Sequence, residues 1–230
     1  MLTNYAIVLA SGTGSRYGGN VPKQFEKIAG RTILEHTLDV FEKSDYTDKI
    51  VLVITPEYRE KAEQILSQNN YKKLVKILNG GEQRKDSSYI GVSSIEETEA
   101  NVFIHDCARP FVTERIIKEC AEALNKYKAV NVAVQSTDTI YTVKNSFIES
   151  IPERKYLMRA QTPQCFKLSV IKKAHELSKN DNNFTDDCGL VVKYKLADVY
   201  IVEGDIENIK ITYPSDIYLA ERIYAERFSD

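Results

Sequence analysis

The sequence has few of the residues that build metal centres and disulfide-stabilised folds. It contains four cysteines, three histidines and no tryptophan in 230 residues. The cysteines lack C-x-x-C spacing and have no histidine partners at metal-ligand intervals, so we predict no structural zinc site. Reduced thiols are typical of the cytoplasm, where we expect the protein to act.

A strong excess of one charge and long apolar runs are also missing. The 31 basic and 33 acidic residues leave a net charge of −2. This balance predicts no broad surface for nucleic acid or anionic membranes, so any anion site must be local. No run approaches the roughly 18 apolar residues of a membrane helix, and no basic region precedes the short N-terminal apolar run. We therefore expect neither a membrane span nor a signal peptide.

Strand and helix patterns alternate along the chain, in a composition of 43% hydrophobic and 28% charged residues that is typical of globular proteins. This alternation predicts an α/β fold with a mostly parallel sheet and helices on both faces. No repeat or long linker interrupts residues 1–230, so we expect a single domain. The expected strands are 6–10, 50–55, 74–78, 102–104, 130–134, 198–203 and 209–212; the expected helices are 32–43, 56–68, 88–97, 114–127, 168–178 and 214–228.

The alternation breaks after residue 134. Residues 138–143 and 147–151 alternate in polarity around the polar turn 144–146, which predicts a β-hairpin. A hairpin inserted in a parallel α/β chain has no neighbours in the main sheet. We therefore expect residues 137–155 to project as an arm that contacts a partner subunit.

A glycine-rich stretch, 11–23, follows the first expected strand and carries Arg16 and Lys23. Glycines allow backbone N–H groups to approach a polyanion, and fixed cations neutralise its charge, so the stretch is typical of a phosphate site. Taken alone, it is equally consistent with a turn carrying two solvated basic residues.

Other polar segments also follow strands, and the carboxyl ends of parallel strands meet at one edge of a sheet. Together these segments bring several cations and two carboxylates, but no nucleophile beside a histidine. This inventory favours phosphoryl or nucleotidyl transfer with Mg²⁺ over acyl transfer. His105 ends an apolar strand, and we expect a hydrogen-bonded structural residue there rather than a catalyst. The cations are Arg16, Lys23, Arg84, Arg109 and Lys210, and the carboxylates are Asp106 and Asp138.

Six motifs in register, from about Tyr5 to Arg222, resemble the methylerythritol-phosphate and ribitol-phosphate cytidylyltransferases. The resemblance implies a Rossmann-like nucleotidyltransferase fold and a homodimer joined through the arm. It also implies that CTP and a polyol phosphate give a CDP-polyol and pyrophosphate, with Mg²⁺ as cofactor. The motifs are LASGTGSRYG with PKQ, GGEQRKDS, HDCARP, QTPQCF, TDD and NIKIT.

The resemblance also implies roles for individual residues. It implies that the CTP triphosphate binds the loop formed by Ala10, Ser11, Gly12, Thr13 and Gly14, with Arg16 and Lys23 on its phosphates. Lys23 and Lys210 flank the α-phosphate, while Ala10, Gly81 and Ser87 contact cytosine and Arg84 supports their loop. On the acceptor side the implied residues are Asp106, Arg109, Thr162 and Thr185, together with Thr139 and Arg154, which reach the acceptor phosphate of the partner subunit.

Two assignments stay open among these residues. Asp106 either binds Mg²⁺, contacts a substrate hydroxyl, or does both. Asp186 and Asp187 either cap a helix or take part in the site.

We predict the acceptor from positions at which this sequence differs from the methylerythritol-phosphate enzymes. Tyr141 replaces the basic residue that methylerythritol-phosphate enzymes commonly carry after Asp-Thr-Ile, and Cys188-Gly189 replaces their small Ala-Ser pair. These differences favour a pentitol phosphate such as D-ribitol 5-phosphate, used for a cell-surface polymer. Ala108 supports the alternative, 2-C-methyl-D-erythritol 4-phosphate in isoprenoid biosynthesis.

Two other functions fit the sequence less well. The glycines Gly12, Gly14 and Gly18 superficially resemble the dinucleotide fingerprint of an NAD(P)-dependent oxidoreductase. However, the third glycine stands one place too late, and Pro22 and basic residues occupy the loop. A non-catalytic CTP sensor would leave Lys23 and Lys210 unexplained.

Overall fold

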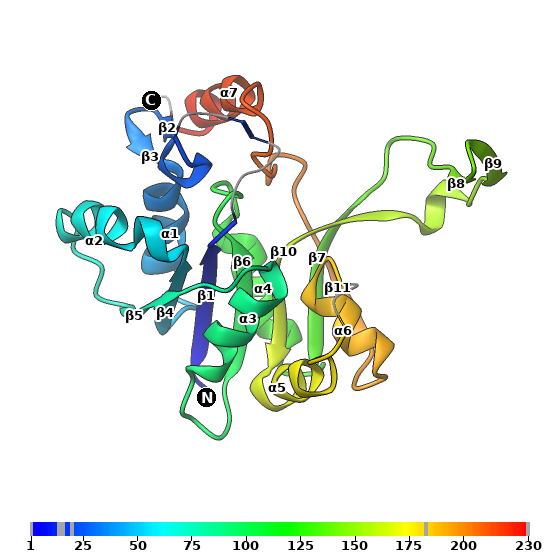
Figure 1. The fold of residues 1–230 in the computed structure, drawn as a ribbon, viewed down its shortest axis with the longest axis horizontal. Helices are drawn as coiled ribbons and strands as arrows, with labels where there is room; N and C mark the ends of the chain where they lie inside the picture. The colour runs from blue at the N-terminus through cyan, green and yellow to red at the C-terminus, as the bar shows by residue number, and fades with distance from the viewer. Residues whose placement is uncertain (1, 13–16, 19–20, 182–183, 229–230) are drawn as a thin grey trace.

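The computed structural model describes residues 2–12, 17–18, 21–181 and 184–228. A seven-stranded sheet crosses the molecule in the order β11-β7-β10-β6-β1-β4-β5 (Figure 1). Strand β10 is antiparallel to both of its neighbours, and the other pairs are parallel. The strands are β1 (Asn4–Ala10), β4 (Lys49–Ile54), β5 (Leu74–Asn79), β6 (Asn101–Asp106), β7 (Ala129–Gln135), β10 (Met158–Lys167) and β11 (Val199–Glu203).

Both faces of the sheet are covered by helices. In β1, Ala6 and Val8 pack on one face while Ile7 and Leu9 pack on the other, which explains why this strand is apolar throughout. One face carries α1 (Ile33–Lys43), α2 (Arg59–Ser67), α4 (Glu114–Ala123) and α7 (Asp216–Phe228); the other carries α3 (Arg84–Ser93), α5 (Leu168–Leu177) and α6 (Asp187–Lys193). The predicted α/β class, with a mostly parallel sheet and helices on both sides, is confirmed.

Local capping fixes where several helices begin. The Thr32 side chain accepts a hydrogen bond from Glu35 N, and the Glu35 carboxylate bonds back to the Thr32 backbone, so a capping box starts α1. Thr113 caps α4 by accepting from Ile116 N. The short elements are η1 (Lys23–Phe25), η2 (Pro56–Tyr58), η3 (Arg154–Tyr156), β2 (Lys27–Ile28) and β3 (Arg31–Thr32).

Several of the elements expected from the sequence were wrong, missing or differently bounded. Residues 209–212 are irregular because their bonds go elsewhere: Ile211 N donates to Ala108 O, and Thr212 N donates to Asp216 Oδ2. Strand β10 was not predicted because its buried half is largely polar and shows no alternation. Helix α6 was also missed, and α3 begins at Arg84 and ends at Ser93 rather than near residue 97.

The predicted hairpin is present as β8 (Thr142–Lys144) and β9 (Phe147–Ser150), which form a separate two-stranded sheet. Figure 1 shows it at the end of a long arm that extends away from the main sheet. All residues of both strands are exposed in the single chain. In the described part of the chain, no helix combines the length and apolar character needed to cross a bilayer.

Candidate active site

A cavity of about 410 Å³ lies where β1 and β6 end, within the size range of small-molecule sites. Parallel strands bring their carboxyl ends to the same edge, so loops far apart in the sequence meet there. The cavity is lined by Leu9, Ala10, Ser11, Gly12, Tyr17, Lys23, Gln24, Glu82, Arg84, Asp106, Cys107, Ala108, Phe184, Thr185, Lys210 and Thr212.

Many of the predicted site residues meet in this cavity. They come from both implied halves of the site, the nucleotide side and the acceptor side. The lining includes Ala10, Ser11, Gly12, Lys23, Arg84, Asp106, Thr185 and Lys210. The predictions for Thr13, Gly14 and Arg16 concern positions outside the described residues.

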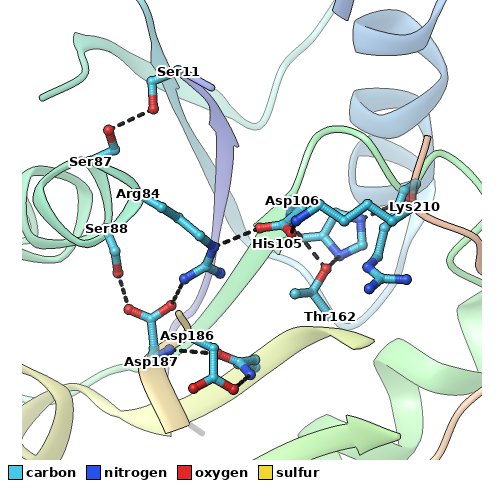
Figure 2. A network of polar contacts seen from close by, with 12 residues as sticks. Ser11, Arg84, Ser87, Ser88, His105, Asp106, Thr162, Asp186, Asp187 and Lys210 are labelled. Atoms are coloured by element: carbon cyan, nitrogen blue, oxygen red, sulfur yellow. Dashed lines mark hydrogen bonds and ion pairs between the residues drawn. The ribbon is translucent and has the colours of Figure 1, made fainter. Parts of the chain in front are cut away.

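Asp106, the last residue of β6, is the charged centre of the cavity (Figure 2). Its Oδ1 accepts from Arg84 Nε at 2.9 Å, and its Oδ2 accepts from Lys210 Nζ at 2.6 Å. Burial raises the pKa of Asp106, but the charges of Arg84 and Lys210 outweigh burial and hold the pKa well below its ordinary value. Asp106 is therefore a carboxylate at any physiological pH.

Arg84 binds a second carboxylate. Its Nη1 donates to Asp187 Oδ2 at 2.6 Å, so the guanidinium joins β6 to the first residue of α6. Burial lowers the pKa of Arg84, but the two carboxylates raise it above its ordinary value. Of the two neighbouring aspartates, Asp186 caps α6 by accepting from Gly189 N. Asp187 instead pairs with Arg84, a residue of the site.

Small residues allow the loop before α3 to approach β1 closely. A Cβ on Gly80 would lie 2.4 Å from the Ser11 Cβ, so a larger residue would displace the loop. Ser87 Oγ bonds to Ser11 Oγ at 2.6 Å and accepts from Gly81 N at 3.1 Å. Gly81 and Ser87 thus hold the shape of the predicted nucleotide loop and are not among the residues that line the cavity.

Lys23 enters the cavity from the short helix η1 after Pro22, and its Nζ donates to Ile211 O at 3.3 Å. The next residue, Gln24, is buried and donates from Nε2 to Ala10 O at 3.2 Å. Gln24 therefore joins η1 to the end of β1 and fixes the place from which Lys23 reaches into the cavity.

Behind Asp106, a buried chain of hydrogen bonds fixes its backbone. Thr162 Oγ1 accepts from Asp106 N at 3.1 Å and lies 3.0 Å from His105 Nδ1. His105 Nε2 lies 3.0 Å from Arg109 O, which can only accept, so Nε2 carries the proton and Nδ1 accepts from Thr162. His105 is fully buried and structural, as predicted. Thr162 supports Asp106 from behind and is not part of the cavity lining.

The remaining predicted acceptor residues lie away from the cavity of the same chain. Arg109 donates from Nη1 to Asn208 O at 2.8 Å and from Nη2 to Ala160 O at 3.3 Å. Burial lowers the pKa of its guanidinium. Thr139 and Arg154 are exposed at the base of the arm, where Arg154 Nη1 donates to Thr137 O at 3.0 Å.

A dedicated metal cage is absent from the part of the chain that the structure describes, where no three His, Cys, Asp or Glu side chains gather as metal ligands. Mg²⁺ commonly binds through one or two carboxylates together with substrate phosphates and water. Asp106 offers one such carboxylate at the cavity, so the residues present fit a cation that arrives with a nucleoside triphosphate.

Comparison with known proteins identifies the family. The family model of 2-C-methyl-D-erythritol 4-phosphate cytidylyltransferase (IspD) matches residues 4–226. The chain belongs to this family. It is a CTP-dependent cytidylyltransferase, which excludes the nicotinamide-dependent alternative.

Relatives with different printed functions are almost equally similar to this IspD-family protein. It is 40% identical to the 2-C-methyl-D-erythritol 4-phosphate cytidylyltransferase of Geobacillus kaustophilus, with 99% of this chain and 100% of the relative covered. It is 39% identical to the bifunctional ribulose 5-phosphate reductase/CDP-ribitol pyrophosphorylase of Haemophilus influenzae. That alignment covers 97% of this chain but 48% of the relative, so the chain spans about half of its length.

Solved structures share the fold of this IspD-family protein. The 4-diphosphocytidyl-2C-methyl-D-erythritol synthase of Anaerococcus prevotii superposes with a TM-score of 0.85 at 28% identity, and 96% of each chain is covered. The cytidylyltransferase of Francisella tularensis gives a TM-score of 0.81 at 29% identity, covering 96% of this chain and 99% of the other. The predicted Rossmann-like nucleotidyltransferase fold is confirmed.

Sequence reasoning missed several residues at the site of this cytidylyltransferase. Gln24 stands in the Pro-Lys-Gln motif, so its place beside Lys23 was a usable signal. Phe184 directly precedes Thr185 and lines the same cavity. The pairing of Arg84 with Asp187 had no such signal, because 103 positions separate the two residues.

The neutral state of His105 leads to a prediction. Burial lowers its pKa to about 4. Because the unfolded chain binds this proton near pH 6.5, stability is present above that pH and is lost as pH falls toward 4, by about 3 kcal/mol. The ring resonances of ¹⁵N-labelled histidine, assigned with His36→Gln and His175→Gln, should show His105 neutral at pH 5. A His105 ring that titrates near pH 6.5 would contradict this assignment.

Proposed function

We propose that this cytidylyltransferase transfers CMP from CTP to D-ribitol 5-phosphate, giving CDP-ribitol and pyrophosphate. The observation that carries the transfer chemistry is that Lys23, Arg84 and Lys210 line one cavity, where Arg84 and Lys210 both bind the Asp106 carboxylate. Such a cavity attracts phosphates, and burial raises the pKa of the Cys107 thiol in its lining to about 12, so that thiol stays protonated.

In the proposed reaction, a phosphate oxygen of the acceptor attacks the α-phosphorus of CTP. A new bond forms between them, the bond from the α-phosphorus to the oxygen bridging the β-phosphate breaks, and pyrophosphate leaves with that electron pair. The attacking oxygen is already anionic near neutral pH, so the step needs no general base. The buried hydrogen bonds of His105 agree with this, since both of its ring nitrogens are engaged.

The transfer is promoted by fixed positive charge. Lys23 and Lys210 enter the cavity from opposite ends of the sequence, and both are anchored by oxygen acceptors. In the proposal they flank the α-phosphate and stabilise the charge of the pentacoordinate state, together with Arg16. Because the anchors hold Lys23 and Lys210 before substrate binds, these two lysines need little reorganisation during the reaction.

We also propose Mg²⁺ as the cofactor, held by Asp106 and the phosphates of CTP. When bound, the cation neutralises phosphate charge and assists departure of pyrophosphate. Asp106 meets this need because its lowered pKa keeps it ionised. The four buried free cysteines and the requirement for CTP support a cytoplasmic location.

Three residues support a pentitol phosphate as the acceptor. Tyr141 lies on the arm and is half exposed, where a basic residue is common in methylerythritol-phosphate enzymes. Cys188 and Gly189 lie in the first turn of α6, three and four positions after Thr185, which lines the cavity. The similarity to the Haemophilus influenzae CDP-ribitol pyrophosphorylase agrees with this choice.

The second candidate acceptor is 2-C-methyl-D-erythritol 4-phosphate. It is supported by Ala108, which lines the cavity, and by the similarity to the Geobacillus kaustophilus enzyme. Both candidates are polyol phosphates, and the proposed transfer step is the same for each.

An assay with both acceptors decides between the candidates. Pyrophosphate release is measured with each nucleoside triphosphate, in the presence of Mg²⁺ and either acceptor or neither. Among the nucleotides, we expect pyrophosphate release with CTP alone. We expect kcat/KM to be at least about tenfold higher for D-ribitol 5-phosphate than for 2-C-methyl-D-erythritol 4-phosphate. A preference for 2-C-methyl-D-erythritol 4-phosphate would overturn the ribitol assignment, and no release with CTP and either acceptor would overturn the proposed reaction.

We further propose that the arm joins two copies of this chain. Its apolar side chains are widely exposed in the single chain, with Phe147 at 77% and Tyr156 at 74%. A thin hairpin cannot bury such residues against itself, and a second copy would cover them. Thr139 and Arg154, on the same arm, would then lie beside the acceptor site of the partner.

Phe147→Asp tests the arm as an interface. A buried aspartate should oppose association, so we expect a monomer by light scattering and a loss of activity of about tenfold or more. Tyr218→Asp is the matched control, because Tyr218 on α7 is 81% exposed and lies outside the arm. A fully active Phe147→Asp dimer would exclude the arm as the interface.

A further inference from the structure

Asp187 is a fully buried carboxylate, and one of its partners, Arg84, lines the active-site cavity. Its Oδ2 accepts from Arg84 Nη1 at 2.6 Å, and its Oδ1 accepts a short hydrogen bond from Ser88 Oγ. His175 Nε2 lies 3.6 Å from Oδ1, and the Asp187 backbone N donates to Gln164 Oε1 at 2.9 Å. Figure 2 shows Asp187 below Arg84, on the opposite side of that guanidinium from Asp106.

Capping does not explain Asp187, because Asp186 caps α6. Packing does not explain it either. A buried carboxylate needs a paired cation and further hydrogen bonds to offset its loss of water, whereas an apolar residue of similar size needs neither. What the charge of Asp187 does provide is a second anchor for Arg84.

Two anchors restrict the Arg84 guanidinium in a way that one does not. The group is planar, with its N–H donors in a fixed fork. With Nε on Asp106 and Nη1 on Asp187, both the position and the plane of the fork are set. With Asp106 alone, the guanidinium could rotate into a bidentate pair and draw the Asp106 carboxylate away from Lys210.

We propose that Asp187 is a positioning residue for cytidylyl transfer, which acts through Arg84 to hold the Asp106 carboxylate where it meets Lys210. The inference rests on the proposed roles of Asp106 and Lys210. The contacts of Asp187 connect the acceptor side of the cavity with its nucleotide side. Arg84 and Ser88 connect α3 to α6, next to Thr185, and Ser87 of the same helix contacts Ser11 on the nucleotide side.

This arrangement predicts which kinetic constant changes. Asp187 is not among the residues that line the main cavity, so its loss removes no contact with CTP. Misplacing Asp106 and Lys210 should instead impair the geometry of the reacting groups. In Asp187→Asn we expect kcat to fall about tenfold or more while KM for CTP changes less than about threefold.

Asp39→Asn is the matched control. Asp39 of α1 is also a mostly buried carboxylate, 18% exposed, which binds Arg31 and Tyr71 outside the active site. Both substitutions remove one charge from a carboxylate–guanidinium pair, so both should lower the thermal midpoint. Only Asp187→Asn should lower kcat, and equal kcat values at a temperature where both are folded would overturn the proposal.

A double-mutant cycle tests the route through Asp106. Single-turnover rates are measured for Asp106→Asn, Asp187→Asn and the double variant. If Asp187 acts by holding Asp106, adding Asp187→Asn to Asp106→Asn changes the rate less than about twofold. If the fold-decrease in the double variant instead equals the product of the two single fold-decreases, Asp187 does not act through Asp106.

Should Asp187→Asn fail to fold, Ser88→Ala removes only the hydroxyl that donates to Asp187. We expect a decrease in kcat of about threefold with an unchanged KM for CTP, and an unchanged kcat would contradict the proposal. Failure of the reaction itself is distinguishable. Wild-type protein would then release no pyrophosphate, whereas failure of this inference leaves wild type active and Asp187→Asn equally fast.

Discussion

The contact on which the site depends is the Asp106 carboxylate held between Arg84 and Lys210. Each partner comes from a different part of the fold: Arg84 from the start of α3, and Lys210 from the irregular segment before α7. Without the negative charge of Asp106, the cations Arg84 and Lys210 would face each other across one cavity. Asp106 therefore lets positive charge gather in the cavity where we propose that phosphates bind, and it joins the two halves of the chain there.

The sheet supplies the position of this contact. Asp106 ends β6, directly beside β1, whose last residues lead into the glycine-rich loop. Thr162 of the antiparallel strand β10 holds the Asp106 backbone from behind, and His105 completes that support without a charge of its own. The chemistry of the family agrees with this construction, since cytidylyl transfer to a phosphate needs fixed cations and no general base.

The sequence was sufficient for most of the architecture and for eight of the residues that line the cavity. Buried strands and helix caps are local signals, and Asp106 ends one such strand, whereas Lys23 and Lys210 stand in short sequence motifs. What failed depended on tertiary contacts. Residues 209–212 have the sequence pattern of a strand, but their backbone N–H groups donate to Ala108 and Asp216. Strand β10 buries polar side chains that find hydrogen-bond partners only in the folded protein. The pairing of Arg84 with Asp187 needed the folded chain for the same reason.

The central claim is that fixed cations, rather than a general base, carry the transfer. The most direct measurement is the single-turnover rate of Lys23→Ala with saturating CTP and acceptor, compared with Lys118→Ala on the exposed side of α4. We expect a fall of at least about 100-fold for Lys23→Ala, with an unchanged thermal midpoint and a normal rate in the control. A near-normal rate for Lys23→Ala would contradict this central claim.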